Sequence, residues 1–225
     1  MIIGNGLIAN AFRDFDREDV VFFASGVSNS LEKDPAQFTR EENLIRKTIR
    51  ENRDKILVYF STCSIYDSSK NGSPYVNHKL NMEHLVAVEC ENYLIARASN
   101  AVGKGGNPNT LINYFVDSIQ NQRPVNLHIK ATRNLIDVAD IVNIILELIS
   151  SQTHNRIVNV AYLSNYSPLE IISALEKHLN TKANLNLSDE GQGYSIDIPD
   201  IESYFELNNL WNKENYLKNI LAKYY

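Results

Sequence analysis

The sequence contains little of what marks a disulfide-rich, membrane-spanning or nucleic-acid-binding protein. Two cysteines, Cys63 and Cys90, give no disulfide framework and suit a reducing compartment. No apolar run approaches the ~18 residues that a membrane helix needs, and the N-terminal stretch lacks the features of a signal peptide. Basic residues are outnumbered, and the net charge of −5 argues against a nucleic-acid or anionic-membrane partner. We therefore expect a cytoplasmic protein that binds neither nucleic acid nor membrane.

Histidines are also few and scattered. The five of them form no cluster with metal-ligand spacing, so we predict no metal site. The sequence does have the composition of a folded protein, with 44% hydrophobic and 22% charged residues. Its 225 residues suffice for one α/β domain, or for one domain with a small added lobe.

Short β-branched runs alternate with longer helical patterns along the chain. The predicted strands are Met1–Ile3, Asp19–Ala24, Lys55–Thr62, Tyr93–Ser99 and Arg156–Ala161. The predicted helices are Leu7–Phe15, Gln37–Arg53, Pro74–Cys90, Asn109–Asn121, Val138–Ser150, Ser167–Leu179 and Lys213–Tyr224. This alternation predicts a Rossmann-type, doubly wound parallel sheet. We expect residues 1–124 to form mainly the cofactor-binding core. Residues 125–225 would add a small C-terminal substrate lobe and the last elements of the core, in one integrated unit.

A glycine-rich turn follows the first predicted strand. It reads Gly4-Asn5-Gly6-Leu7-Ile8-Ala9, the G-x-G-x-x-A pattern of dinucleotide-binding folds. The first glycine permits a tight turn, the second lets backbone approach a pyrophosphate, and the small third residue allows close helix packing. The alternative is an ordinary glycine-rich turn between a strand and a helix.

The residues after this turn depart from the pattern. A dinucleotide fold ends its second strand in an acid that holds the adenosine ribose. Here the next strand ends in Ala24-Ser25-Gly26, and the nearby acids precede it. Either the ribose is held differently, or the usual second β-unit of such a fold is missing. The choice between NAD and NADP therefore stays open.

A second motif places a tyrosine four residues before a lysine. Hydride transfer to a carbonyl needs a proton donor at the oxygen, and a nearby ammonium lowers the pKa of a tyrosine that serves as one. The spacing occurs twice, as Tyr66/Lys70 and Tyr75/Lys79. Tyr66 leads into a loop-like composition, whereas Tyr75 follows a serine and a proline, which is typical of a helix start. We therefore favour Tyr75 and Lys79; the alternative is a surface helix with a solvated lysine.

With these motifs the chain resembles the extended short-chain dehydrogenase/reductase family of sugar-nucleotide epimerases, dehydratases and reductases. The resemblance runs nearly from end to end and implies that Thr62 joins Tyr75 and Lys79 in a catalytic trio. Asn43 lies where the family carries an asparagine on the next helix. The implied cofactor contacts are Gly4, Gly6, Leu7, Ile8, Ala24, Ser25, Gly26, Tyr75 and Lys79.

The resemblance also implies contacts with the diphosphate of a nucleotide-sugar substrate. Asn100 lies in a segment similar to the family's R-x-x-N-x-x-G, and Arg133 lies where the family has a diphosphate-binding arginine. A guanidinium suits bidentate phosphate contact. The alternative for Arg133 is a surface ion pair with Asp137 or Asp140. Asn159 resembles a structural asparagine of the fold. The predicted substrate site therefore consists of Thr62, Asn100 and Arg133.

Other departures narrow the reaction. The family's 4,6-dehydratases carry Asp-Glu directly after the catalytic threonine, where this chain has Cys63 and Ser64, so dehydration is disfavoured. The family's epimerase-reductases carry a cysteine two residues before the strand's tyrosine. Here Ser64 holds that position, and Cys63 stands one residue earlier, so its thiol points to the other face of the strand. A nucleophilic pair of Cys63 with His78 has no further support, and a small packed thiol is the favoured interpretation.

The sequence thus predicts an NAD(P)-dependent oxidoreductase acting on a nucleoside-diphosphate sugar. Net reduction of a 4-keto sugar is favoured, because a trimmed cofactor region fits a cofactor that exchanges at each turnover. A 4-epimerase would use the same trio, and a non-catalytic protein that binds a dinucleotide or sugar nucleotide is the alternative of another class. The resemblance further implies synthesis of surface-polysaccharide sugars. A homodimer through the helices 37–53 and 74–90 would fit the family's habit.

Overall fold

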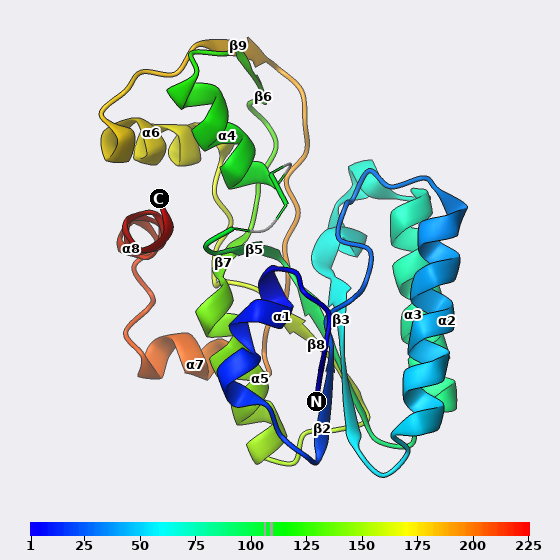
Figure 1. The fold of residues 1–225 in the computed structure, drawn as a ribbon. Coiled ribbons are helices and arrows are strands. Elements are labelled where there is room, and N and C mark those ends of the chain that lie inside the picture. The colour runs from blue at the N-terminus through cyan, green and yellow to red at the C-terminus, as the bar shows by residue number, and fades with distance from the viewer. Residues whose placement is uncertain (106, 109) are drawn as a thin grey trace.

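A five-stranded parallel sheet forms the centre of the molecule (Figure 1). The computed structural model describes residues 1–105, 107–108 and 110–225. In spatial order the strands are β1 (Ile2–Ile3), β2 (Val20–Phe23), β3 (Ile56–Thr62), β4 (Tyr93–Ala98) and β8 (Arg156–Val160). Each strand pairs in parallel with the next. The predicted α/β fold with a parallel sheet is confirmed.

The strands are apolar throughout because both of their faces are covered. In β2, Val20 and Phe22 pack into one hydrophobic core, whereas Val21 and Phe23 pack into another. Side chains alternate between the two faces of a strand, so an unbroken apolar run serves both cores. Helices lie on both sides of the sheet (Figure 1). They are α1 (Leu7–Ala11) and α5 (Val138–Ser150) on one face, and α2 (Pro35–Glu51) and α3 (Pro74–Glu89) on the other.

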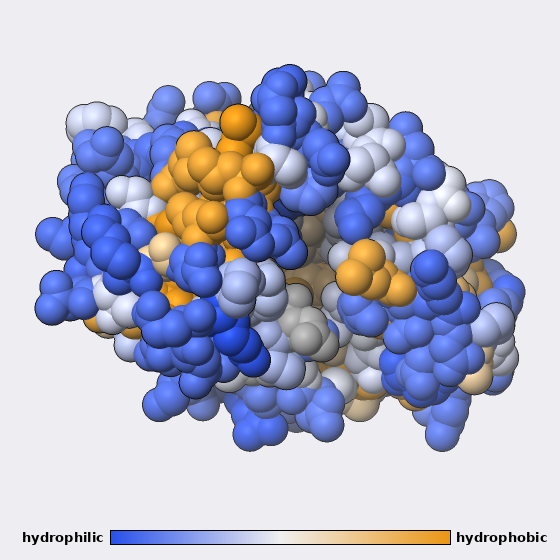
Figure 2. All heavy atoms as spheres, turned by 90° about the horizontal axis from the view of Figure 1, so that it is seen from above, coloured by the Kyte–Doolittle hydropathy of each residue, from blue (hydrophilic) through white to orange (hydrophobic). Residues whose placement is uncertain are grey.

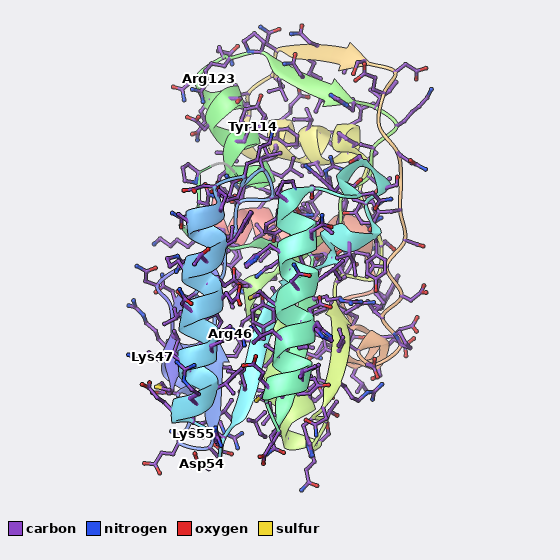
Figure 3. All side chains as sticks on the ribbon, turned by 90° about the vertical axis from the view of Figure 1, so that its right-hand side faces the viewer. Arg46, Lys47, Asp54, Lys55, Tyr114 and Arg123 are labelled. Atoms are coloured by element: carbon purple, nitrogen blue, oxygen red, sulfur yellow. The ribbon has the colours of Figure 1, made fainter. Side chains whose placement is uncertain are left out.

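Helices α2 and α3 lie side by side over the sheet, as the view of that face shows (Figure 3). Arg46 joins them by pairing with Glu42 at 3.0 Å on its own helix and with Glu89 of α3. The stripe of α2 that faces inward contains Glu41, Ile45 and Ile49 together with a threonine. The homodimer expected through these two helices stays a prediction.

The remaining elements lie beyond the carboxyl ends of the sheet strands or beside α5 (Figure 1). They are β5 (Asn100–Val102), α4 (Leu111–Gln120), β6 (Val125–His128), β7 (Leu135–Asp137), α6 (Pro168–Leu179), β9 (Leu185–Ser188), α7 (Glu202–Leu207) and α8 (Lys213–Tyr224). Strand β5 pairs with β7, and β6 pairs with β9. The division of the chain at residue 124 stays a prediction. None of the helices in the described ranges has the length and hydrophobicity to cross a bilayer.

The predicted elements match the observed ones, with three differences. The helix expected over Leu7–Phe15 ends at Ala11 and continues as a short 3-10 turn, η1 (Arg13–Phe15). The helix expected over Asn109–Asn121 corresponds to α4. Its expected first residue, Asn109, lies outside the described residues, and α4 is described from Leu111. Four short strands, β5, β6, β7 and β9, were not predicted, because three or four residues are too few to show a period. The helix α7 was not predicted either.

The connection from β1 to β2 differs in hand from the two crossovers that follow it, which run through α2 and α3. The steps from β1 to β2 and from β2 to β3 run in the same direction, yet α1 and α2 cover opposite faces (Figure 1). The two crossovers therefore have opposite hands, although such crossovers are almost always right-handed. A strand–helix–strand unit on the free side of β1 would let α1 make a crossover of the same hand as those through α2 and α3. This is the unit for which the segment from Gly6 to Asp19 is too short.

Candidate active site

A cavity of about 920 Å³ opens at the carboxyl ends of the sheet strands, where ligands bind in open α/β sheets. Seen from above, the surface is hollowed near its middle and mostly hydrophilic around the hollow (Figure 2). Of the predicted site residues, all but Gly4 line this cavity. They are Gly6, Leu7, Ile8, Ala24, Ser25, Gly26, Thr62, Tyr75, Lys79, Asn100 and Arg133. Residues far apart in the sequence are thus brought to one place.

The turn after β1 requires glycine at its first position. Gly4 has φ +132°, and a Cβ there would lie 2.7 Å from the carbonyl carbon of Ala24. Gly4 therefore lets the turn pack against the end of β2 rather than facing the cavity. Nothing lies within 4 Å of a Cβ built on Gly6, so its backbone is open to a ligand.

The loop after β2 forms the next part of the wall. Arg40 of α2 fastens this loop by donating to the carbonyl oxygen of Ser25 at 3.1 Å and to its hydroxyl at 3.4 Å. A Cβ on Gly26 would lie 2.7 Å from Lys79 Nζ and 2.8 Å from Glu41 Oε1. Glycine at this position therefore lets the loop lie directly on a buried ion pair.

Thr62 ends β3 and begins the short 3-10 turn η2 (Cys63–Tyr66). Its hydroxyl accepts a hydrogen bond from the amide of Ser64 at 3.0 Å, so the side chain is fixed at the strand end. Tyr75 and Lys79 lie one turn apart in α3, and both are buried at the cavity. The predicted helix start is confirmed, because Ser73 caps α3 by accepting from the amide of Val76.

Lys79 is 3% exposed and is held by three oxygens. Its ammonium lies 3.1 Å from Glu41 Oε1, 2.9 Å from the Tyr59 hydroxyl and 3.0 Å from the Phe60 carbonyl oxygen. Glu41 is fully buried and also accepts from the amide of Val27 at 2.6 Å. One carboxylate therefore joins α2, β3, α3 and the loop after β2.

Arg40 and Glu41 are the residues of α2 that reach this site. Asn43, which lies where the family carries an asparagine, is exposed. The sequence carried a signal for Glu41, because it stands four residues before Ile45 and eight before Ile49 on the apolar stripe of the helix. A carboxylate on such a stripe needs a buried partner. Its partner is Lys79.

Tyr75 has a high pKa in this setting. Burial raises the pKa of Tyr75 to about 12, an interaction with the Thr62 side chain lowers it, and the charge of Glu41 raises it further. The expectation that Lys79 lowers this pKa therefore does not hold here. The reason is that the ammonium is compensated by Glu41 at 3.1 Å.

The other tyrosine–lysine pair does not share a helix. Tyr66 ends η2, and Lys70 ends a separate 3-10 turn, η3 (Ser68–Lys70). The Tyr66 hydroxyl donates to Asn159 at 3.0 Å, and Asn159 in turn donates to the carbonyl oxygen of Asp197 at 2.8 Å. Tyr66 and Asn159 therefore tie the C-terminal segment to the core.

Cys63 and His78 do not form a nucleophilic pair. Cys63 is 1% exposed and donates to the carbonyl oxygen of Arg97, and burial raises the pKa of its thiol to about 12. His78 instead lies 3.0 Å from Glu41 and stacks on Phe38, with ring centroids 4.6 Å apart. The interpretation of Cys63 as a small packed thiol agrees with these contacts.

Asn100 and Arg133 also line the cavity, on β5 and just before β7. Asn100 donates to the carbonyl oxygen of Asn134 at 2.7 Å, and Arg133 donates to that of Thr132 at 2.7 Å. The carboxylate nearest to Arg133 in the described chain is that of Asp67, at 3.9 Å. Arg133 is therefore a partly exposed cation that faces the cavity.

The alternative ion pairs of Arg133 are not formed, since both carboxylates are engaged elsewhere. Asp137 caps α5 and pairs with Lys223 at 2.9 Å. Asp140 accepts hydrogen bonds from the hydroxyls of Tyr204 at 2.8 Å and Tyr216 at 2.6 Å.

The cavity lining is cationic although the whole chain carries −5. Among the described residues, Arg40, Lys70 and Arg133 line it against one side-chain carboxylate, Asp67, whereas the fourth cation, Lys79, is paired with Glu41. Within the described ranges, Arg40 and Lys70 form no ion pair. A positive pocket in an acidic protein favours an anionic ligand. The described residues contain no group of three potential metal ligands.

A family model described as the NAD dependent epimerase/dehydratase family matches residues 4–161. The chain belongs to this family. The match runs from the glycine turn to the residue after β8 and includes the whole predicted trio. The prediction of an NAD(P)-dependent enzyme is thereby confirmed, with NAD or NADP as the cofactor class. No curated protein matches the chain.

Solved structures of nucleotide-sugar enzymes share the fold. RMD from Pseudomonas aeruginosa, complexed with NADPH, is 19% identical, with TM-score 0.69 over 91% of this chain and 80% of that one. UDP-glucuronic acid 4-epimerase from Bacillus cereus, with NAD, is 17% identical, with TM-score 0.74 over 91% and 72%. dTDP-glucose 4,6-dehydratase from Bacillus anthracis, with NAD, is 16% identical, with TM-score 0.72 over 96% and 75%. At these identities the likeness shows the fold alone.

The epimerase/dehydratase site fits one part of a dinucleotide well. The open backbone at Gly6, the loop from Ala24 to Gly26 and the Tyr75–Lys79 face all border the cavity. These groups suit the nicotinamide, its ribose and the adjoining phosphate. The fit differs at the adenosine end, because the described sheet has no strand on the free side of β1.

Proposed function

We propose that the chain transfers hydride between a nicotinamide cofactor and a sugar carbon of a nucleoside-diphosphate sugar, with net reduction of a 4-keto sugar as its direction. One observation carries this proposal. A single cavity is lined by the glycine turn, by the trio of Thr62, Tyr75 and Lys79, and by Asn100 and Arg133. A ligand with a diphosphate at Arg133 would have its sugar near the trio.

Each member of the trio has a distinct task in this proposal. Tyr75 donates its proton to the keto oxygen of the sugar as hydride arrives at the carbon. Thr62 donates a hydrogen bond to the same oxygen and holds it in place. Lys79 would contact the nicotinamide ribose by exchanging one of its three present oxygen partners for a ribose hydroxyl. The bound cofactor supplies the hydride.

The protonation of Tyr75 supports the reductive direction. A hydroxyl with a pKa of about 12 carries its proton throughout the neutral range and can act as an acid there. Oxidation of a sugar hydroxyl would instead require Tyr75 as a base, in the form that its surroundings disfavour.

The residues after Thr62 support reduction over dehydration. Elimination of water needs a carboxylic acid near the sugar, and Cys63 is instead buried with its thiol on a carbonyl oxygen. The lining carboxylate, Asp67, accepts hydrogen bonds from the amide and hydroxyl of Ser69 and lies nearest to Arg133. It therefore belongs to the predicted diphosphate end.

The test is reduction of a panel of 4-keto sugar nucleotides by NADH or NADPH, followed by the loss of nicotinamide absorbance. Tyr75→Phe should lower kcat at least about 100-fold, because the proton donor is lost. The mutant should keep its affinity for the sugar nucleotide. The matched control is Tyr66→Phe, which changes the tyrosine of the other tyrosine–lysine spacing and should retain kcat within about threefold when folded.

The outcomes separate the candidate functions. Turnover with NAD and no net change of redox state, with inversion at the sugar carbon, would replace reduction by 4-epimerisation. Cofactor and sugar nucleotide binding without turnover on any substrate of the panel would favour a binding protein. Equal activity of Tyr75→Phe and the wild type would contradict the assigned trio.

A further inference from the structure

The sheet offers a dinucleotide one of its two customary half-sites. A doubly wound dinucleotide fold is built from two mononucleotide-binding halves, which lie on either side of the crevice where the strand order reverses. Here the order β1-β2-β3-β4-β8 does not reverse, and β1 is the edge strand of the described sheet. The first two crossovers have opposite hands, and a further strand–helix–strand unit of a dinucleotide fold would lie on the free side of β1 (Figure 1).

The half-site that is present is complete and rigid. The loop after β2 is held by Arg40 at Ser25 and by Glu41 at the amide of Val27. Lys79 lies beneath Gly26 of the same loop. Only the short stretch Asn5–Ile8 of the β1 side reaches the cavity. Contacts for a ligand are therefore concentrated at the nicotinamide end.

Arg40 supplies a phosphate partner at this end. It is exposed, lines the cavity and forms no ion pair within the described ranges. Lys79, the other cation on this side, is compensated by Glu41. Arg40 is therefore the cation free to face a phosphate next to the glycine turn.

Resting on the proposed function, we propose that the cofactor site is a mononucleotide site. It holds the nicotinamide, its ribose and the adjoining phosphate, with Arg40 at that phosphate, and it leaves adenosine outside. The 2′-phosphate that distinguishes NADP from NAD sits on the adenosine ribose. The site therefore does not discriminate between NADH and NADPH, and reduced nicotinamide mononucleotide suffices as a ligand.

The experiment compares the dissociation constants of NADH, NADPH and reduced nicotinamide mononucleotide by nicotinamide fluorescence, with the intact chain. The three constants should agree within about tenfold, because adenosine adds few contacts. Millimolar AMP should not displace NADH, whereas nicotinamide mononucleotide should. A second readout is the variant Arg40→Gln, which should weaken all three ligands by a similar factor of about 3 to 10. Arg50→Gln, on the same helix but away from the cavity, is the control and should change none.

Other results would overturn the inference in distinguishable ways. NADH binding about 100-fold more tightly than the mononucleotide, or displacement by AMP, would show a site for adenosine. If Leu31→Ala abolished this tighter binding of NADH, the adenosine site would lie on the loop that carries Leu31. This side chain is 69% exposed and lines the cavity. Such a result leaves the proposed hydride transfer intact. Binding of none of the three, even with a sugar nucleotide present, would overturn the proposed function and this inference together.

Discussion

The carboxylate of Glu41 faces an ammonium, an imidazole, a hydroxyl and a backbone amide inside the protein. These partners are Lys79, His78, Tyr59 and Val27, all within 3.1 Å. Burial raises the pKa of Glu41, but Lys79 and the three hydrogen bonds together lower it well below its usual range. The carboxylate is therefore ionised and fully satisfied. Removing it would leave a buried ammonium with two neutral oxygens.

Glu41→Gln should lower the free energy of unfolding by about 3–5 kcal/mol at neutral pH, since it breaks a buried ion pair by removing one partner. The measurement is urea unfolding of the variant and the wild type. Glu42→Gln is the matched control, because Glu42 lies next to it and pairs with Arg46 at the surface. It should cost less than about 1 kcal/mol. Equal costs for the two variants would contradict the role given to Glu41.

The cost of Glu41→Gln should depend on pH with a definite sign. The pKa of Glu41 is lowered in the folded state from 4.5, so its stabilisation is present above that value and is lost as pH falls through the folded-state pKa. The difference between variant and wild type should therefore shrink in acid. A difference that grows as the pH falls would show that another group dominates.

At this scale the sequence predicted the residues whose spacing is local and missed those that depend on packing between elements. Thr62, Tyr75 and Lys79 carry recognisable neighbours, so they could be proposed as a set, and the cavity brings them together. Arg40 and Glu41 stand in a charged stretch that reads as a solvated helix face. The apolar stripe of α2 distinguishes Glu41 within this stretch, but only the packing of α2 on α3 shows that Lys79 is its partner.

At the scale of elements, α8 is fastened to the start of α5 by aromatic side chains. Tyr216 of α8 stacks on Tyr162, with ring centroids 3.9 Å apart. Its hydroxyl donates to Asp140 at 2.6 Å and accepts from the amide of Asp137 at 2.9 Å. The C-terminal Tyr225 lines the cavity, so the docking of α8 bears on the site.

Tyr216→Phe should cost about 1–3 kcal/mol of unfolding free energy, because the ring stack stays while two buried hydrogen bonds are lost. Burial raises the pKa of Asp140, and the Tyr216 hydroxyl lowers it. The variant therefore raises this pKa further, so its cost should be larger at neutral pH, where Asp140 is ionised, than in acid. Urea unfolding at both pH values measures it. Tyr114→Phe, at a residue that is 40% exposed, is the control and should cost little. A neutral effect of Tyr216→Phe would mean that water replaces the hydroxyl.

The elements could be predicted from the sequence where a strand is buried on both of its faces. An apolar run such as Val20–Phe23 has one explanation, a strand covered on both faces, and it was placed within one residue. The pair of β5 and β7 could not be foreseen, because three residues show no period and their partner lies 35 positions away along the chain. The end of α1 at Ala11 also depends on packing rather than on its residues' helix propensity.

At the scale of the whole molecule, the cavity lies between the sheet and the elements from β5 onward. Its walls come from the glycine turn, the loop after β2, the end of β3, the start of α3 and the segment around Arg133. The cations in these walls make the cavity more positive than the chain as a whole, which has a net charge of −5. A ligand that contacts both sides of such a cavity should stabilise the fold as a whole, since it binds only where these segments meet.

NADH and a nucleotide sugar should each raise the melting temperature, and together they should raise it by more than either alone. At 100 times its dissociation constant a ligand adds about 2.7 kcal/mol, which corresponds to about 5–10 °C for a chain of this size. Arg133→Gln should remove most of the shift with the nucleotide sugar and keep the shift with NADH, because Arg133 is the residue proposed to hold the sugar's diphosphate and is not among the predicted cofactor contacts. Calorimetry of both proteins with each ligand measures this. Equal loss of both shifts in Arg133→Gln would mean that Arg133 maintains the cavity rather than holding the sugar's diphosphate.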